Sequence, residues 1–267
     1  MSNNLTDVKV EIILPNYNSE SYLPETIDSI INQTFKNWKL TIVDGNSNIE
    51  TQRILKNYMN HPNINIIKLK KKKKAGFCRN LAMRNSQSDY IAFIDSDDIW
   101  DKKKLSKQID FMIKNNYYFT YTNYLPFTSE KNRNKLSEIK PEKYFDFDKF
   151  TGNTSIATST MIIKRSSIGN TKFSSTKICE DYFFKCEILK KVDYAYCLSE
   201  NLMKYRIRKD SLQSNKIRNL YWIWYINKNY NKMNFFKNLL SILCISINSI
   251  KKYGFKLFYF IFIFNCI

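Results

Sequence analysis

The sequence predicts an α/β fold built around a mostly parallel central sheet, and three observations support this prediction. Short apolar runs alternate with segments of helical periodicity through the first half of the chain, the pattern of repeated strand–helix units. Polar clusters follow three of the apolar runs, at residues 15–18, 44–47 and 95–98. The chain of 267 residues is 43% hydrophobic with only 5 glycines and 5 prolines, which excludes collagen-like and disordered classes.

Four apolar runs in the first half are expected to form buried strands. They span residues 10–14, 40–43, 64–69 and 90–94. Pro15 is expected to close the first of these strands in a turn. Helices are expected between and after the runs, over residues 23–34, 53–59, 79–85 and 103–113. In parallel sheets ligands bind beyond the carboxyl ends of the strands, where the polar clusters lie.

The second half is less regular. Strands are expected at residues 117–122, 160–164, 194–198 and 203–207. A helix is expected to start near Glu180. Residues 129–148 are polar and weakly patterned, so we expect them to form a long loop.

The composition changes near residue 219, which divides the chain into a domain over residues 1–215 and an extension over 216–267. The extension interleaves aromatic and aliphatic residues with lysines, and its longest apolar run, residues 257–264, is too short to cross a bilayer. This pattern predicts amphipathic helices that lie in a membrane interface. Packing of the same helices on the core of the domain is the alternative.

The chain is strongly basic, with 43 Lys and Arg against 24 Asp and Glu and a net charge of +19. Such a balance predicts an anionic partner, either nucleic acid, an anionic bilayer or a phosphorylated substrate. A general compositional bias is the alternative explanation.

The six cysteines form no C-x-x-C pair and the chain has one histidine, which argues against a zinc site and a disulfide framework. The polar N-terminus lacks a signal peptide, which predicts a cytoplasmic protein.

The strongest chemical signal is the acidic cluster that follows the fourth apolar run. Asp95, Asp97 and Asp98 lie within four residues, where their charges repel one another. A divalent cation such as Mg²⁺ or Mn²⁺ would relieve this repulsion and could bridge to a substrate diphosphate. Capping of the helix that follows is the structural alternative.

The context of this cluster favours a nucleotide ligand. Asp44 ends another strand, and Arg79 precedes the acidic strand. Residues 70–74 are five consecutive lysines, which are either cations for phosphate groups or a solvated loop. The forked guanidinium of arginine suits phosphate oxygens.

Five segments of the chain form an ordered set of motifs: Ile12-Ile-Leu-Pro15-x-Tyr17-Asn18-x-Glu20-x-Tyr22-Leu23, Ser29-Ile-x-x-Gln33-Thr34, Ile42-Val43-Asp44, Arg79-Asn80 and Asp95-x-Asp97-Asp98-x-Trp100. In combination, over residues 8–210, they closely resemble the motifs of the family 2 glycosyltransferases with the GT-A fold. The resemblance implies that the chain is an inverting enzyme that transfers a sugar from a nucleotide-diphosphate donor. It also implies a Mn²⁺ or Mg²⁺ ion held by Asp95 and Asp97.

The resemblance assigns further residues to the donor. Those implied to bind the nucleotide-sugar are Pro15, Tyr17, Asp44, Arg79, Asp95, Ser96 and Arg208. Among these, Pro15 and Tyr17 would border the nucleobase and Asp44 would contact the nucleoside. Arg79 and Arg208 would lie near the nucleotide and its diphosphate.

Glu180-Asp181 resembles the family motif that supplies the general base. The attacking hydroxyl must lose a proton, and a positioned carboxylate can accept it. Asp181 is the favoured base and Glu180 the second candidate. The alternative is that both acids only stabilise the first turn of a helix.

Two departures from the family pattern stand out. Gly45 replaces the second acid that usually follows Asp44, and Arg208 stands where a histidine is common. An arginine can neutralise phosphate but cannot bind a metal.

The resulting hypothesis is a peripheral enzyme on the cytoplasmic face of the inner membrane. Its substrates would be a UDP-hexose, with glucose or galactose favoured, and a saccharide on a polyprenyl diphosphate, in surface polysaccharide or O-antigen biosynthesis. Nucleic acid is not expected as a partner. The alternatives are a metal-dependent nucleotidyltransferase, although no Gly-rich phosphate loop follows the first strand, and a basic nucleic-acid-binding module, although no binding motif is present.

Overall fold

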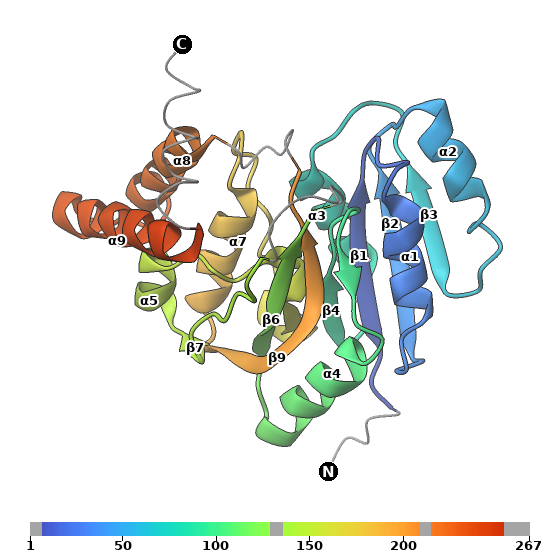
Figure 1. Ribbon diagram of the computed structural model, residues 1–267, viewed down its shortest axis with the longest axis horizontal. Coiled ribbons are helices and arrows are strands. Elements are labelled where there is room, and N and C mark those ends of the chain that lie inside the picture. Colours follow the sequence, from blue (N-terminus) through green and yellow to red (C-terminus); the bar gives the residue numbers. More distant parts are fainter. Residues whose placement is uncertain (1–6, 129–135, 209–214, 254–267) are drawn as a thin grey trace.

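The computed structural model describes residues 7–128, 136–208 and 215–253, and its centre is a nine-stranded sheet (Figure 1). The strands are β1 (Val10–Asn16), β2 (Trp38–Asp44), β3 (Ile64–Lys68), β4 (Tyr90–Phe93), β5 (Ile99–Trp100), β6 (Phe119–Phe127), β7 (Tyr144–Phe145), β8 (Ile162–Lys164) and β9 (Ala195–Arg206). The helices are α1 (Leu23–Ile31), α2 (Ile49–Lys56), α3 (Ala75–Asn85), α4 (Lys104–Asn115), α5 (Phe147–Gly152), α6 (Arg165–Ile168), α7 (Glu180–Leu189), α8 (Lys216–Asn229) and α9 (Phe235–Tyr253), with a 3₁₀ turn, η1, at Thr158–Thr160.

The strand order is β3-β2-β1-β4-β8-β6-β9-β5, with β7 paired to β9. The first four strands of this order are parallel, as are the long strands β6 and β9, whereas the shorter β5, β7 and β8 run antiparallel to their neighbours. The predicted α/β class with a mostly parallel sheet is therefore confirmed. After β3 the chain crosses back to place β4 beside β1, which creates the kind of switch point where α/β sheets bind ligands.

Two apolar cores cover the two faces of the sheet, because successive strand residues point to opposite faces. Ile12 and Leu14 of β1 pack in one core with α1, α2 and α4, while Ile13 packs in the other core with α3, α5 and α7. Both cores are almost completely buried. They fix the carboxyl ends of β1, β2 and β4 side by side.

Several predicted boundaries were wrong. The first strand does not close at Pro15 but continues to Asn16, paired with β2 through Pro15 opposite Val43. Pairing with β4 ends at Ile13, so that edge of β1 is open at Pro15 and tolerates a residue without an N–H.

The two strands expected at 194–198 and 203–207 are one strand, β9, whose pairing with β6 shifts register on either side of Asn123. These irregularities let a single strand carry a broken apolar pattern. The expected loop over 129–148 contains β7 and the first residues of α5, and residues 129–135 lie outside the described part. The helix expected at 53–59 is α2, which ends at Lys56.

The C-terminal helices α8 and α9 form a pair that packs on the side of the domain carrying α5 and α7 (Figure 1). Ile223 and Ile226 of α8 and Ile245 of α9 are buried in the same core as α7. The outer side of α9 is apolar and exposed, with Phe236 80% and Leu240 61% accessible. None of the helices in the described ranges has both the length and the apolar composition needed to cross a bilayer. The run at 257–264 lies outside those ranges.

Candidate active site

An acidic turn lies at the carboxyl end of β4, and its three carboxylates have different surroundings. The side chains of Asp95 and Asp97 are 37% and 20% exposed, whereas Asp98 is only 1% exposed. Burial and the charge of Asp95 raise the pKa of Asp97. Burial together with Asp97 and Asp95 raises the pKa of Asp98 well above its usual value. The turn thus offers two accessible carboxylates and anchors itself through the third.

Ser159 of η1 holds both ends of this turn. Its hydroxyl accepts a hydrogen bond from the backbone N–H of Asp95 at 3.0 Å and donates one to Asp98 Oδ2 at 2.5 Å. The other oxygen of Asp98 accepts the backbone N–H of Arg206 in β9 at 3.0 Å. Asp98 is therefore a positioning residue, because it ties the acidic turn to two other segments of the sheet.

Arg79 bridges the acidic turn to the start of α7. Its guanidinium contacts Asp95 Oδ1 at 2.5 Å and Glu180 Oε1 at 3.4 Å, and the residue is 4% exposed. Burial opposes the charged form of Arg79, but the carboxylates of Asp95 and Glu180 outweigh it and raise the pKa. Arg79 therefore connects Asp95 and Glu180 through its buried, positively charged guanidinium.

Glu180 and Asp181 occupy the first turn of α7, as expected for that position in the sequence. Cys179, immediately before them, has a left-handed conformation with φ 60°, which a β-carbon makes unfavourable. Lys185, one turn later in α7, contacts Asp181 Oδ2 at 2.8 Å, and Thr158 of η1 donates to the same oxygen at 3.2 Å.

The two acids of α7 differ in proton affinity. Burial would raise the pKa of Asp181, but the ammonium group of Lys185 outweighs it and lowers the pKa to about 2. Burial raises the pKa of Glu180 above its usual value, although Arg79 opposes this. Asp181 is therefore ionised throughout the physiological range, and Glu180 is the more basic carboxylate.

The ends of β1 and β2 hold the predicted nucleoside residues. Asp44 is 1% exposed and accepts hydrogen bonds from Asn16 Nδ2 at 2.7 Å and from the backbone N–H of Ser47 at 3.1 Å. Pro15 is buried within β1, whereas Tyr17 is 39% exposed, with Lys72 Nζ 4.1 Å from its ring centroid. Of these residues, Tyr17 presents the accessible aromatic surface.

Arg208 lies beside the acidic turn, as its place in the sequence suggested. Its guanidinium contacts Asp97 Oδ2 at 3.2 Å, and Ser96 lies half-buried between the two accessible acids. Two ion-paired groups therefore meet at the acidic turn: Arg208 with Asp97, and Arg79 with Asp95 and Glu180.

Asp95 and Asp97 suit a divalent cation. Two carboxylates supply hard oxygen ligands and leave further positions for water and phosphate oxygens, as Mg²⁺ and Mn²⁺ prefer. A cation there would also relieve the repulsion that raises the pKa of Asp97. In the described residues no group of three or more His, Cys, Asp or Glu side chains gathers as a metal centre, so these two acids would be the protein ligands.

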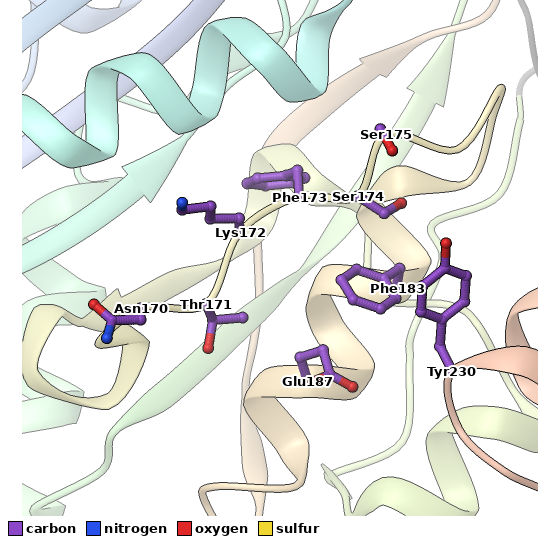
Figure 2. Close-up of a pocket in the computed structure, with 9 residues that line it drawn as sticks. All are labelled: Asn170, Thr171, Lys172, Phe173, Ser174, Ser175, Phe183, Glu187 and Tyr230. Atoms are coloured by element: carbon purple, nitrogen blue, oxygen red, sulfur yellow. The ribbon is translucent and has the colours of Figure 1, made fainter.

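Two hollows flank the loop that precedes α7. One, of about 330 Å³, is lined by residues 170–175 and by Phe183, Glu187 and Tyr230 (Figure 2). Phe183 and Tyr230 meet edge to face there, with ring centroids 5.1 Å apart. The other, of about 300 Å³, lies between the lysine run, the start of α3 and Glu180. Phe173, Ser174 and Ser175 border both hollows.

Sequence reasoning missed two residues that organise the site. Lys185 had a usable signal, since it follows Asp181 by four residues in an expected helix and such pairs meet on one face. Ser159 had none, because its contacts to the acidic turn depend on how β8 pairs with β4.

The comparisons with known proteins agree with this geometry. Residues 11–170 match the family described as Glycosyl transferase family 2. TuaG of Bacillus subtilis (strain 168), a glycosyltransferase assigned to teichuronic acid biosynthesis, is 30% identical over 91% of this chain and 96% of its own length. WfgD of Escherichia coli, named as a UDP-Glc:alpha-D-GlcNAc-diphosphoundecaprenol beta-1,3-glucosyltransferase, is 31% identical over 82% of this chain and 85% of its own.

Solved structures share the fold. TarS 1–349 of S. aureus in complex with UDP-GlcNAc aligns with a TM-score of 0.68 at 20% identity, over 87% of this chain and 70% of that chain. The mannosyltransferase PcManGT of Pyrobaculum calidifontis, in complex with GDP-Man and Mn²⁺, aligns with a TM-score of 0.67 at 14% identity, over 89% and 69%. The family match, the similar sequences and the GT-A architecture lead to one conclusion: this chain belongs to the family 2 glycosyltransferases.

Proposed function

We propose that the protein transfers a hexose, glucose or galactose, from a UDP-sugar to a hydroxyl group of a lipid-linked saccharide in surface polysaccharide biosynthesis. The observation that carries this proposal is the buried guanidinium of Arg79, which joins Asp95 of the acidic turn to Glu180 at the start of α7. The reaction for which WfgD is named supports a UDP-glucose donor and a diphospholipid-linked acceptor, and the teichuronic acid pathway for which TuaG is named supports a role in polysaccharide synthesis.

The donor is proposed to lie across the carboxyl ends of β1, β2 and β4. The nucleobase would stack on the exposed ring of Tyr17, beside Pro15, and the nucleoside would reach the end of β2 at Asp44. Asp95 and Asp97 would hold a divalent cation, Mn²⁺ or Mg²⁺, which when bound offsets the charge of the diphosphate leaving group. Ser96 and Arg208 lie beside these acids, and Arg208 would meet phosphate oxygens.

The transfer is proposed to be a single displacement with inversion. The acceptor oxygen forms a bond to the anomeric carbon while the bond from that carbon to the diphosphate oxygen breaks, and UDP leaves with the bonding electrons. Asp181 accepts the proton of the acceptor hydroxyl. Lys185 keeps this carboxylate ionised and fixes its orientation. Arg79 would set the spacing between Asp95 and Glu180. Its closeness to the nucleotide remains a prediction.

The test is a transfer assay with the purified full chain and Mn²⁺. UDP-Glc and UDP-Gal are incubated with a short-chain lipid diphosphate carrying GlcNAc, and the product is identified by mass spectrometry. Asp95→Asn with Asp97→Asn should abolish transfer in a folded protein, whereas Asp181→Asn should abolish transfer but retain UDP binding. Unchanged transfer by the Asp95/Asp97 variant would contradict the proposal. In a separate thermal-shift measurement, UDP with Mn²⁺ should stabilise the protein, whereas single-stranded DNA, the control ligand, should not.

We further propose that α9 attaches the protein to the cytoplasmic face of an anionic inner membrane as a peripheral protein. Its outer apolar side chains recur at helical spacing and are exposed: Phe235, Phe236, Leu239, Leu240, Leu243 and Ile247. Lys251 is also exposed on this helix and is suited to acidic headgroups, whereas Lys237 is paired with Asp148 at 2.7 Å. All of α9 belongs to the proposed extension, residues 216–267.

Sedimentation with phosphatidylglycerol vesicles tests this attachment. Phe236→Ser with Leu240→Ser should lower the bound fraction several-fold. The matched control, Ile49→Ser with Met59→Ser, also removes two exposed apolar side chains, one at the start of α2 and one in the turn after it, and should bind as the unaltered chain does. Equal binding by both variants would contradict the proposal, as would a dimer in solution that depends on Phe236 and Leu240.

A further inference from the structure

The hollow between the lysine run and the loop before α7 has two fixed walls. The side chain of Asn80 in α3 donates to the backbone carbonyl of Phe173 at 2.9 Å and accepts the backbone N–H of Phe173 at 2.8 Å. The ring of Phe173 stacks on Phe184 of α7 with centroids 4.1 Å apart. These contacts hold residues 173–176 at a set distance from α3, so the hollow is part of the packed structure.

The opposite wall is held by a close backbone approach at Gly45. A β-carbon at position 45 would lie 2.9 Å from the backbone oxygen of Lys73 and 3.3 Å from that of Asn16. A side chain at position 45 therefore has no room here, and glycine lets the lysine-bearing loop lie against the end of the sheet.

Positive charge gathers at this end of the hollow. Lys72, Lys73 and Lys74 line it and are exposed, and none of the three pairs with a carboxylate in the described ranges. Lys74 Nζ donates a hydrogen bond to the backbone carbonyl of Lys177 at 3.2 Å. This bond connects the lysine run to the loop that precedes α7. The first turn of α3 has no acidic residue and no side-chain cap, so its N–H groups add to the positive potential.

The other end of the hollow has the opposite character. Glu180 lines it, with its charge shared with Arg79. Gly76 permits this arrangement, because a β-carbon there would lie 2.8 Å from Glu180 Cγ. A ligand that fits must therefore carry an anionic group at the lysine end and hydroxyl groups at the carboxylate end.

We infer that this hollow binds the diphosphate group of the acceptor and thereby places the adjoining sugar against the acids of α7. This inference rests on the proposed function. A sugar diphosphate has the required polarity, because its neutral sugar ring is bonded directly to a strongly anionic group. The diphosphate of the donor has its own site at Asp95 and Asp97, on the other side of Arg79.

The test compares two variants with the same loss of charge in the same lysine run. Lys73→Gln with Lys74→Gln alters the hollow, whereas Lys70→Gln with Lys71→Gln alters exposed lysines that do not line it. Transfer is measured with a short-chain lipid diphosphate carrying GlcNAc and with a neutral alkyl glycoside of the same sugar. Binding of the diphosphate acceptor is measured separately by calorimetry.

The Lys73/Lys74 variant should raise KM and Kd for the diphosphate acceptor by roughly tenfold or more, because a charge-assisted contact contributes over 1 kcal/mol. Its KM for the neutral acceptor and for the UDP-sugar should be unchanged, and the control variant should match the unaltered chain.

Equal effects of both variants would overturn the inference, as would an increase in KM confined to the UDP-sugar. If the unaltered chain transfers to neither acceptor, the proposed function fails. In that case the calorimetric Kd alone decides on the hollow, and equal affinity of the unaltered chain and the Lys73/Lys74 variant would reject it.

Discussion

Replacing Lys185 by methionine should reveal which acid of α7 is the general base. Lys185 is 3% exposed and is the main group that lowers the pKa of Asp181 from 3.8 to about 2. A difference of nearly 2 pH units corresponds to about 2.5 kcal/mol of preference for the ionised form. Without the ammonium group, burial dominates and the pKa of Asp181 should rise by about 2 units or more.

The assay is the pH dependence of kcat at saturating substrates. If Asp181 is the base, the unaltered chain should keep its rate down to the lowest pH at which it stays folded, because the acid limb lies near pH 2. In Lys185→Met that limb should move up into the measurable range. If Glu180 is the base, the acid limb of the unaltered chain should already lie in the measurable range, since burial raises the pKa of Glu180 above its usual value.

The control is Lys190→Met, which removes a lysine paired with Glu187 at 2.6 Å on the same helix, away from both acids. Its pH profile should match that of the unaltered chain. Circular dichroism verifies folding, because an unpaired buried carboxylate can destabilise a protein by about 3–5 kcal/mol. An unshifted acid limb in folded Lys185→Met would refute the reasoning.

Three further predictions concern the support of the site. Ser159→Ala leaves Asp98 and the Asp95 N–H without their shared partner, so the KM for the UDP-sugar should rise and stability should fall by about 2 kcal/mol in urea unfolding; an unchanged KM would contradict the positioning role. Burial lowers the pKa of Lys104 to about 7, below its unfolded value of 10.5, so the unfolded chain binds more protons between these values and stability rises with pH. From pH 6 to 8.5 this group should add about 2 kcal/mol, and Lys104→Met should abolish that increment in thermal unfolding. Gly45→Ala should lower the free energy of unfolding in urea by about 1–3 kcal/mol, because the backbone oxygens of Lys73 and Asn16 lie too close to the new β-carbon. Unchanged stability would contradict this, since it would mean that the loop moves to make room.

The fold was largely predictable because its first strands are continuous apolar runs, a local signal. The site was predictable to the extent that its residues lie at the ends of those strands, as Asp44 and Asp95 do. The family resemblance added the acids of α7 and placed Arg79, already notable for its position before the acidic strand, near the nucleotide. Their contacts depend on pairing between segments about 100 residues apart.

Errors arose where tertiary pairing overrides local signals. Proline is a strand breaker by propensity, but Pro15 lies at an edge that only the register of β4 leaves open. Asn46, in contrast, follows a local signal: it lies in the polar cluster at 44–47, and its φ of 70° is a conformation that asparagine tolerates. The lysine hollow was beyond sequence reasoning, because its second wall comes from residues 173–176.

The shared guanidinium of Arg79 couples the two halves of the site. One cation divides its attraction between Asp95, on the proposed donor side, and Glu180, on the proposed acceptor side, so neutralising either acid leaves it to the other. Occupancy of the two half-sites is therefore thermodynamically linked, and the linkage is reciprocal. A donor that takes over the charge of Asp95 would strengthen the ion pair with Glu180, and a ligand that neutralises Glu180 would strengthen the ion pair with Asp95.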